Sequence, residues 1–410
     1  MLRFLTTHVV PALTKLSENM YLSAVRAGMV AVVPLTIIGG LFMIVAYLPV
    51  AGWDARVEPY LLLLQVPVTA TFGILAVVAC FSIAYELGKQ LKQEAIVSAL
   101  MATVIFLMLR IDVTDQTLMM DRLGSKGLFS AILIAVVSVR VQKFFTDRHL
   151  VIRLPASVPT IVYDSFLSLT PLFCLVLVFW SIRFVAGIDV DYLVQSVFKP
   201  LVFALNTLPG ILVYAFLVTM LWSVGINGDN ALDAIVAPIF LQYLAANVEA
   251  VTAGVPLPYV TAYGFFTNFV NVGGTGATIA LALVLRNSKE PGFRKISRLS
   301  LPTQIFQINE PIFFGLPIVL NPIFMVPYVL NALILTTGSY LLMDWHVIHK
   351  PFVNIPWTTP PIIGHYLVSG GDWKAAVWGA VSIVIAMLVY FPFAKAAERQ
   401  RMKMESHVTS

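Results

Sequence analysis

The stretch IFQINEPIFFGLPIVLNPIF, residues 305–324, decides how this chain folds. Within an apolar run it carries one carboxylate, Glu310, and prolines at 311, 317 and 322. Proline has no backbone N–H and interrupts a helix. An ionised side chain in an apolar membrane segment is costly and is retained where it faces a cavity or a partner. The stretch therefore predicts a broken helical segment that lines something polar.

The rest of the chain is equally apolar. Of its 410 residues 59% are hydrophobic and 11% charged, and the mean hydropathy is +0.87. A soluble surface needs more charge than this. Apolar runs long enough to span or nearly span a bilayer occur at 24–50, 68–88, 94–111, 128–146, 163–188, 208–226, 318–343 and 373–394. Residues 230–286 add roughly two interrupted spans, so we expect an all-α integral membrane protein with about ten transmembrane helices.

Basic residues indicate the orientation. Half of the 26 Lys and Arg lie in three short segments beside apolar runs, at 140–153, 286–298 and 395–403. By the positive-inside rule these segments are cytoplasmic. Lys15 and Arg26 place the N-terminus on the same side, which requires an even number of spans.

The best candidate boundary is GIDVDYLVQSVFKPLVFALNT, residues 187–207, which reads as an interfacial amphipathic stretch. After it the apolar runs are broken by GINGDN (225–230), VNVGGTGATIA (270–280), INEPIFFGLP (308–317) and NIPWTTPPIIGHY (354–366). Such breaks at membrane depth are tolerated where the freed backbone is buried in protein or lines a wet cavity. We therefore expect a scaffold half (1–190), a linker helix (191–207), a substrate-binding half (208–400) and a cytoplasmic tail (401–410).

Glu310 is the first candidate for the site. It could cap a broken helix through neighbouring N–H groups, but we favour a role as a ligand-facing acceptor in a re-entrant hairpin. Gln307 and Asn309 lie beside it, and both can donate and accept hydrogen bonds.

Two glycine-containing segments are further candidates. Gly273, Gly274 and Thr275 belong to GGTG, which could be a packing turn or a re-entrant turn whose N–H groups face a cavity. The motif is not a phosphate-binding loop, because the Walker pattern is absent. Asn227 and Asp229 belong to GINGDN, which could be a polar interface loop or part of the same site.

PWTTPP, residues 356–361, offers an indole and hydroxyls held by prolines. Trp357 could anchor the chain at the membrane interface or stack on a sugar ring, with Thr358 beside it. His365 is expected to be structural, and Cys80 and Cys174 show no metal or disulfide spacing. Amides, one carboxylate, an aromatic and hydroxyls suit a neutral polyhydroxylated solute, and we expect no metal and no cofactor.

The chain resembles a known family, the membrane subunit IIC of the bacterial phosphoenolpyruvate-dependent sugar phosphotransferase system, lactose/cellobiose (diacetylchitobiose) type. INEPIFFGLPIVLNPIF is similar to its signature. The likeness continues, in order over most of the chain, through LGSKGLF (123–129), LPASVPTIVYDSF (154–166), GGTGAT (273–278), ISRLSLPTQIF (296–306), PWTTPP (356–361), GGDWKAAV (370–377) and YFPFAKAAE (390–398).

The resemblance implies ten transmembrane helices with re-entrant hairpins and interfacial helices, in a homodimer within the lipid of the bacterial inner membrane. It implies a disaccharide bound in the C-terminal half and carried across by rigid-body movement of that half. A soluble IIB partner, phosphorylated by IIA upstream, then transfers phosphate from its phosphocysteine to the sugar 6-hydroxyl. The glutamate near that hydroxyl falls on Glu310, and the tryptophan by the sugar falls on Trp357. Since no cysteine-bearing soluble domain follows the last span, IIB and IIA are expected to be separate polypeptides.

Two positions depart from the family pattern. The family usually has Gly-Ile-His-Gly where this chain has Gly-Ile-Asn-Gly, so Asn227 replaces a histidine thought to contact the reacting end of the sugar. An amide cannot take up a proton near neutral pH as histidine does. Gln307 replaces an asparagine, which is a milder change.

Three functions stay open from the sequence. The first is a sugar permease subunit that presents a disaccharide for phosphorylation, with no phosphoryl chemistry of its own. The second is a secondary transporter, proton-coupled or not, that releases unmodified sugar, and broken helices around an acid suit that class. The third is a sugar-binding membrane sensor that has lost turnover.

Overall fold

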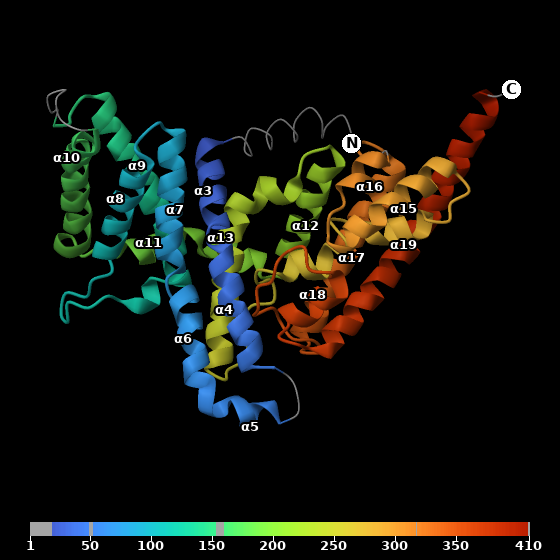
Figure 1. The fold of residues 1–410 in the computed structure, drawn as a ribbon, viewed down its shortest axis with the longest axis horizontal. Coiled ribbons are helices and arrows are strands. Elements are labelled where there is room, and N and C mark those ends of the chain that lie inside the picture. Colours follow the sequence, from blue (N-terminus) through green and yellow to red (C-terminus); the bar gives the residue numbers. More distant parts are fainter. Residues whose placement is uncertain (1–18, 49–51, 153–159, 317, 409–410) are drawn as a thin grey trace.

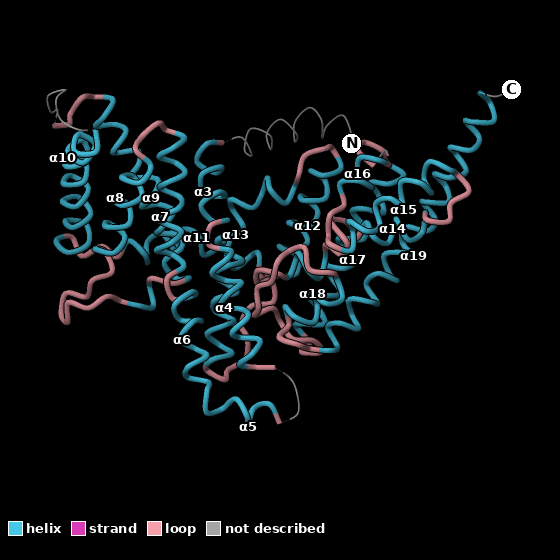
Figure 2. The backbone as a smooth tube through the Cα atoms, viewed as in Figure 1, coloured by secondary structure: helices cyan, strands magenta, loops and turns pink. Residues whose placement is uncertain are grey.

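The structure is a computed structural model that describes residues 19–48, 52–152, 160–316 and 318–408. Across these ranges the chain is helical, and the one pair of bridged residues, Ile111 and Leu118, stands outside any strand. Figures 1 and 2 show helices of uneven length joined by loops that gather in the C-terminal half. The expected all-α membrane fold is confirmed.

The N-terminal half is a bundle around α7 (Leu75–Gln90), which packs against α3, α8 and α9. Its other helices are α3 (Met20–Val30), α4 (Val33–Ala46), α5 (Trp53–Val57), α6 (Leu61–Phe72), α8 (Ala95–Met108), α9 (Leu128–Asp147) and α10 (Thr160–Trp180). Small residues allow the close approach of α3 and α7, because a Cβ on Gly28 would lie 2.7 Å from the Cα of Ile83.

The C-terminal half is more irregular. It comprises α12 (Leu208–Ser223), α13 (Gly228–Thr252), α14 (Thr278–Leu285), α15 (Pro291–Ile305), α16 (Glu310–Gly315), α17 (Pro322–Asp344), α18 (Pro361–Val368) and α19 (Trp373–Val408), with a π-helical stretch at Phe265–Val270. The short helices α14, α16 and α18 alternate with non-helical backbone. The predicted interruptions fall here, and they surround the site described below.

The predicted linker is α11 (Val190–Leu205), which meets α12 at an 84° bend. Its first turn is fastened to the N-terminal half by a buried ion pair. The fully buried Arg110 donates to the carboxylate of Asp191 and to the hydroxyl of Ser130. Arg122 bonds Asp189 at 2.7 Å. Breaking a buried pair of this kind leaves an uncompensated charge, so the start of α11 is held firmly to the scaffold.

The number of spans differs from the expectation. Within the described ranges seven helices are long and apolar enough to cross a membrane, or eight if the bent pair of α11 and α12 is one span. Residues 230–286, expected to add roughly two interrupted spans, contain the long helix α13, which runs unbroken through Pro238, then the largely non-helical residues 253–277 and the short helix α14. The last helix, α19, continues to Val408, so the described part of the expected tail (401–410) is helical.

Where the structure describes both halves, α13 packs against α3, and two side-chain hydrogen bonds also join the halves. Arg26 on α3 donates to the backbone oxygen of Asn230 on α13 at 2.8 Å. Asn354, in the loop before α18, donates to the hydroxyl of Thr36 on α4 at 2.7 Å. Both Thr36 and Asn354 are buried, so α4 lies directly against the loop that precedes Trp357.

Candidate functional site

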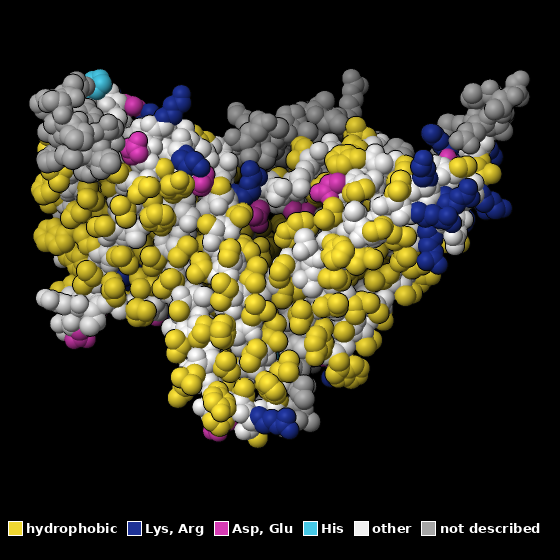
Figure 3. All heavy atoms as spheres, viewed as in Figure 1, with side chains coloured by type: hydrophobic (Ala, Val, Ile, Leu, Met, Phe, Trp, Pro, Cys, Tyr) yellow, Lys and Arg dark blue, Asp and Glu magenta, His cyan; other side chains and the backbone are white. Residues whose placement is uncertain are grey.

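A cavity of about 350 Å³ lies in the C-terminal half, among α12, α13 and the broken segments. Figure 3 shows a hollow at the upper edge of the molecule with acidic side chains in and around it. The volume is near the lower end of the range for ligand pockets. The cavity is lined by Tyr214, Trp222, Asn227, Asp229, Asn230, Asp233, Phe240, Ala262, Tyr263, Gly264, Phe266, Thr267, Asn271, Gly274, Thr275, Gln307, Asn309, Glu310 and Trp357.

The glycine turn at 273–276 forms one wall. Gly274 has φ +106°, and a Cβ there would lie 2.4 Å from the side chain of Asn309, so this position accepts only glycine. The N–H groups of Gly273 and Gly274 donate to Gln307 Oε1 at 2.8 and 3.2 Å. These two N–H groups thus bind the side chain of Gln307, while Gly274 and Thr275 line the cavity.

Two amides expected beside the sugar are thus engaged with the protein. Gln307 is buried and has φ +67°, a left-handed conformation that is costly for a residue with a Cβ. Asn309 is buried as well, and its Nδ2 donates to the backbone oxygen of Thr275 at 3.1 Å. Both side chains brace the turn from behind while lining the cavity.

The carboxylate of Asp229 gathers three donors. It accepts from Trp222 Nε1 at 2.8 Å, from Thr275 Oγ1 at 2.8 Å and from Asn271 Nδ2 at 3.2 Å. These donors come from α12, from the glycine turn itself and from Asn271 just before it. Asp229, expected as a substrate contact, therefore joins α13 to the turn and to α12, with its acceptor capacity largely used.

Glu310 is arranged differently. It is the first residue of α16, it is exposed to the cavity, and its carboxylate has no hydrogen bond or ion pair with any described residue. Pro311 follows it in the first turn of α16, where the backbone N–H groups have no partner within the helix and proline lacks one altogether. A carboxylate left free in a cavity is available to a ligand.

Asn227 is the N-cap of α13. Its Oδ1 accepts from the backbone N–H of Asn230 at 2.9 Å, as asparagine commonly does at this position. The amide nitrogen of Asn227 has no partner among the described residues, and the side chain lines the cavity. The residue that replaces the usual histidine thus caps a helix and keeps one donor for the cavity.

The aromatic segment also reaches the cavity. Trp357 is 57% exposed and lies on the wall. Thr358 and Gly273 are not among the lining residues, although both are next to residues that are. His365 is fully buried and packs edge-on against Phe269, in the structural role expected from the sequence.

Sequence reasoning missed much of the wall. Asp233 and Asn230 follow Asp229 on α13, and Asp233 is one turn away on the same face, which the i, i+4 spacing could have indicated. Tyr214, Tyr263 and Thr267 come from segments with no polar pattern, and only the tertiary structure brings them to the cavity.

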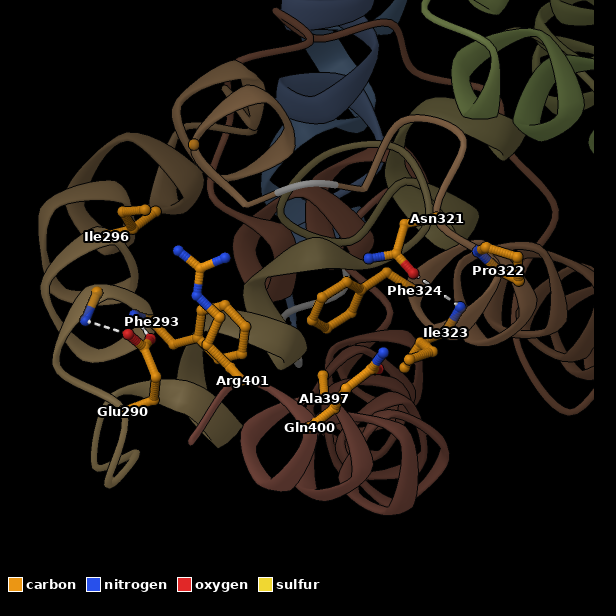
Figure 4. A pocket seen from close by; sticks show the side chains of 12 residues that line it. Glu290, Phe293, Ile296, Asn321, Pro322, Ile323, Phe324, Ala397, Gln400 and Arg401 are labelled. Atoms are coloured by element: carbon orange, nitrogen blue, oxygen red, sulfur yellow. Dashed lines mark hydrogen bonds between the residues drawn. The ribbon is translucent and has the colours of Figure 1, made fainter. Parts of the chain in front are cut away.

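A second cleft, of about 370 Å³, lies among α15, the start of α17 and the end of α19 (Figure 4). Its floor contains Phe293, Ile296 and Phe324, and Arg401 projects over it. The carboxylate of Glu290 caps α15 by accepting from the N–H groups of Gly292 and Phe293. Since its acid is engaged with backbone and its floor is apolar, this cleft offers little to a polyhydroxylated ligand.

Metal binding finds no support in the described part of the chain, where no group of three or more His, Cys, Asp or Glu is placed to hold an ion. The polar groups of the cavity include a free carboxylate at Glu310, a second acid at Asp233 and amide side chains, beside an exposed indole at Trp357. Groups of these kinds can hydrogen-bond and stack on a polyhydroxylated ligand.

Comparison with known proteins agrees with this arrangement. The family model "Phosphotransferase system, EIIC" matches residues 26–332. The cellobiose-specific EIIC component of Geobacillus stearothermophilus is 34% identical over 98% of this chain and 96% of its own length. The lichenan permease IIC component of Bacillus subtilis is 32% identical over 98% and 95%.

Among solved structures, the crystal structure of the transporter ChbC matches with a TM-score of 0.92 and 32% identity, covering 98% of this chain and 99% of that one. ChbC is the IIC component of the N,N'-diacetylchitobiose-specific phosphotransferase system. With the family model covering most of the chain and the fold shared along its length, this protein belongs to the EIIC family of the phosphotransferase system, as a membrane component.

Proposed function

We propose that this chain is the permease subunit of a sugar phosphotransferase system that binds a β-linked disaccharide and presents its 6-hydroxyl to a phosphorylated IIB protein. The observation that carries the proposal is the free carboxylate of Glu310 in a cavity with an exposed indole, within an EIIC chain. Relatives named for cellobiose, lichenan and lactose support a sugar of this class.

The chemistry assigned to the chain is orientation of the acceptor hydroxyl. In the transfer the S–P bond of the partner's phosphocysteine breaks and an O–P bond to the sugar forms. Glu310 accepts a hydrogen bond from the 6-hydroxyl and takes up its proton as the O–P bond forms, which is general-base assistance. Trp357 stacks on a ring, and Asn227 donates to a hydroxyl. Asp229, Gln307 and Asn309 hold the wall in place, so the turn at 273–276 shapes the cavity.

The orientation of the chain follows the distribution of charge. The start of α3 and the end of α19 lie along the same edge of the molecule (Figure 1). Lys and Arg side chains gather at that edge over the end of α19 (Figure 3). With the positive-inside rule, both termini are cytoplasmic. The basic segment 286–298 supplies Glu290, Phe293 and Ile296 to the cleft of Figure 4, and we assign this region as the docking side for IIB.

The organisation assigned to the two halves follows the linker. Because α11 is fastened to the N-terminal half by Arg110 and Asp191, residues 1–190 act as scaffold and form the homodimer contact, and residues 208–400 carry the sugar. Light scattering of the purified protein checks this assignment: a dimer is expected, and a monomer contradicts it.

The test is uptake of labelled cellobiose into membrane vesicles, with and without phosphorylated IIB. Phosphorylated sugar should accumulate only with the partner. Glu310→Gln should lower that accumulation by about 10²-fold or more, because general-base assistance is worth about that factor. Glu58→Gln, an exposed acid far from the cavity, is the matched control and should transport normally.

The competing function, a secondary transporter, predicts a different result. Equal accumulation of unmodified sugar in both vesicle samples would overturn group translocation. Normal phosphorylation by Glu310→Gln would overturn the role given to this residue.

A further inference from the structure

A second cavity adjoins the candidate sugar site. It measures about 270 Å³ and shares four lining residues with the first: Tyr263, Gly264, Thr267 and Trp357. The shared residues form the boundary between the two spaces. The exposed indole of Trp357 therefore borders both cavities, with Glu310 lining only the first.

The far wall of the second cavity comes from the other half of the molecule. Val33 and Ile37 lie one turn apart on α4 and both line this space. They are half-buried, whereas the next residue, Ile38, points away and is 48% exposed. A hydrogen bond holds this wall in place. Asn354, which also lines the cavity, donates at 2.7 Å to the hydroxyl of Thr36, a residue of α4 between Val33 and Ile37.

The lining suits a sugar unit. Apolar surface is supplied by Val33, Ile37 and the segment Ile355–Trp357. Polar groups lie at the sides. The hydroxyl of Thr267 has no hydrogen-bond partner among the described residues. The unpaired side-chain oxygen of Asn268 is buried against α18, where a Cβ on Gly364 would lie 2.6 Å from it, so it is not counted among the groups open to a ligand. A pyranose presents apolar faces edged by hydroxyls, so it matches a chamber with apolar walls and an unpaired hydroxyl at its side.

We infer that the second cavity is a subsite for a third sugar unit, and that Val33 and Ile37 of the scaffold half determine the length of oligosaccharide that the protein accepts. The reacting unit lies at Glu310, the second at Trp357, and the third in the chamber beyond. This inference rests on the proposed function and deepens it, because it names β-linked trisaccharides as ligands along with disaccharides.

The inference assigns a specificity role to residues outside the substrate-binding half. A bulkier side chain at position 37 would fill the chamber from the α4 side and leave the space around Glu310 unchanged. Overfilling a closed space costs about 1–3 kcal/mol, which corresponds to a loss of affinity of about 5- to 150-fold.

The experiment is a binding survey by calorimetry on the purified full-length protein. Two ligand pairs are compared: cellobiose with cellotriose, and N,N'-diacetylchitobiose with its trisaccharide. The parent should bind the disaccharide and the trisaccharide of one pair. Ile37→Phe should weaken trisaccharide binding at least tenfold and change disaccharide binding by less than about twofold. Ile38→Phe adds the same bulk to the outward face of the same helix and should change neither.

Failure of the inference is distinguishable from failure of the proposed function. A parent that binds no disaccharide contradicts the proposed function. A parent that binds a disaccharide but no trisaccharide contradicts the subsite alone, and so does equal binding of the trisaccharide by Ile37→Phe and Ile38→Phe. If Ile37→Phe also loses the disaccharide, the smaller change Val33→Leu on the same face decides: it must weaken only the trisaccharide, and any other result overturns the subsite.

Discussion

At the scale of single residues, two carboxylates in one cavity differ because of what surrounds them. Asp229 accepts three hydrogen bonds from the protein, whereas the carboxylate of Glu310 accepts none from the described residues. A carboxylate whose acceptor sites are filled holds structure together, and one left free is available to a ligand. Composition and spacing cannot separate the two cases, since both residues are acids beside a break in a helix.

If filled acceptor sites make a carboxylate structural, the same Asp-to-Asn substitution should destabilise the protein at Asp229 and not at Asp233, one turn along the same helix. Asp229→Asn replaces an acceptor oxygen with a donor that cannot serve all three neighbours, and hydrogen bonds to a charged group contribute about 1.5–3 kcal/mol each. We expect a clear drop in the melting temperature of the purified protein. Asp233→Asn, one turn along α13 and without a described hydrogen-bond partner, should cause no drop. Equal melting temperatures for the two variants would contradict the role of Asp229 in holding the turn.

At the scale of elements, the glycine turn and the segment 305–324 form one unit. Gln307 binds the N–H groups of the turn, and Asn309 binds its carbonyl at Thr275. These hydrogen bonds stabilise the broken helix at 305–310 through a segment more than thirty residues earlier in the chain. Irregular backbone at membrane depth persists because each segment satisfies the polar groups of the other.

Glycine-to-alanine substitutions should show which positions of this unit do not tolerate a side chain. Gly274→Ala places a Cβ 2.4 Å from Asn309 at φ +106°, so the turn cannot keep its position and both folding yield and sugar binding should be lost. Gly254→Ala is the matched control: its φ is also positive, at +66°, but a Cβ there meets nothing within 4 Å. We expect it to cost about 1 kcal/mol and to leave binding intact. Loss of sugar binding in both variants would contradict this account, because it would mean that a Cβ at positive φ is harmful even without a close contact such as that with Asn309.

At the scale of the whole molecule, the arrangement of the ends agrees with an even number of crossings. The start of α3, the loop after α9 and the end of α19 lie along one edge in Figure 1, and the loop between α8 and α9 lies toward the other. The count of long apolar helices alone does not fix the topology, since α8 has 14 residues and α11 and α12 meet at 84°.

Cysteine labelling in cells tests the topology. In a background of Cys80→Ala and Cys174→Ala, a membrane-impermeant maleimide should label Asp115→Cys in intact spheroplasts. It should label Arg148→Cys only after the membrane is permeabilised. Both positions are exposed, so the difference reports the side of the membrane and not burial. Labelling of Arg148→Cys in intact spheroplasts would reverse the orientation.

The sequence by itself determined that the protein lies in a lipid bilayer and that its fold is helical. An apolar content of 59% with 11% charge allows only a membrane protein, and the prolines and glycines marked where helices break. It also marked Glu310, because a lone acid in an apolar run is conspicuous whatever its surroundings.

The tertiary structure decided which polar groups are free. Hydrogen bonding depends on neighbours in space. Two of the three partners of Asp229, Asn271 and Thr275, and the turn N–H groups that bind Gln307 lie more than thirty positions away in the chain. Only the folded chain shows that these side chains are satisfied by protein, and that Asp233 and Thr267 line the cavity without a described hydrogen-bond partner. For the same reason the wall supplied by Val33 and Ile37 could not be read from their own segment: an aliphatic residue on an apolar helix faces lipid, core or ligand according to what packs beside it.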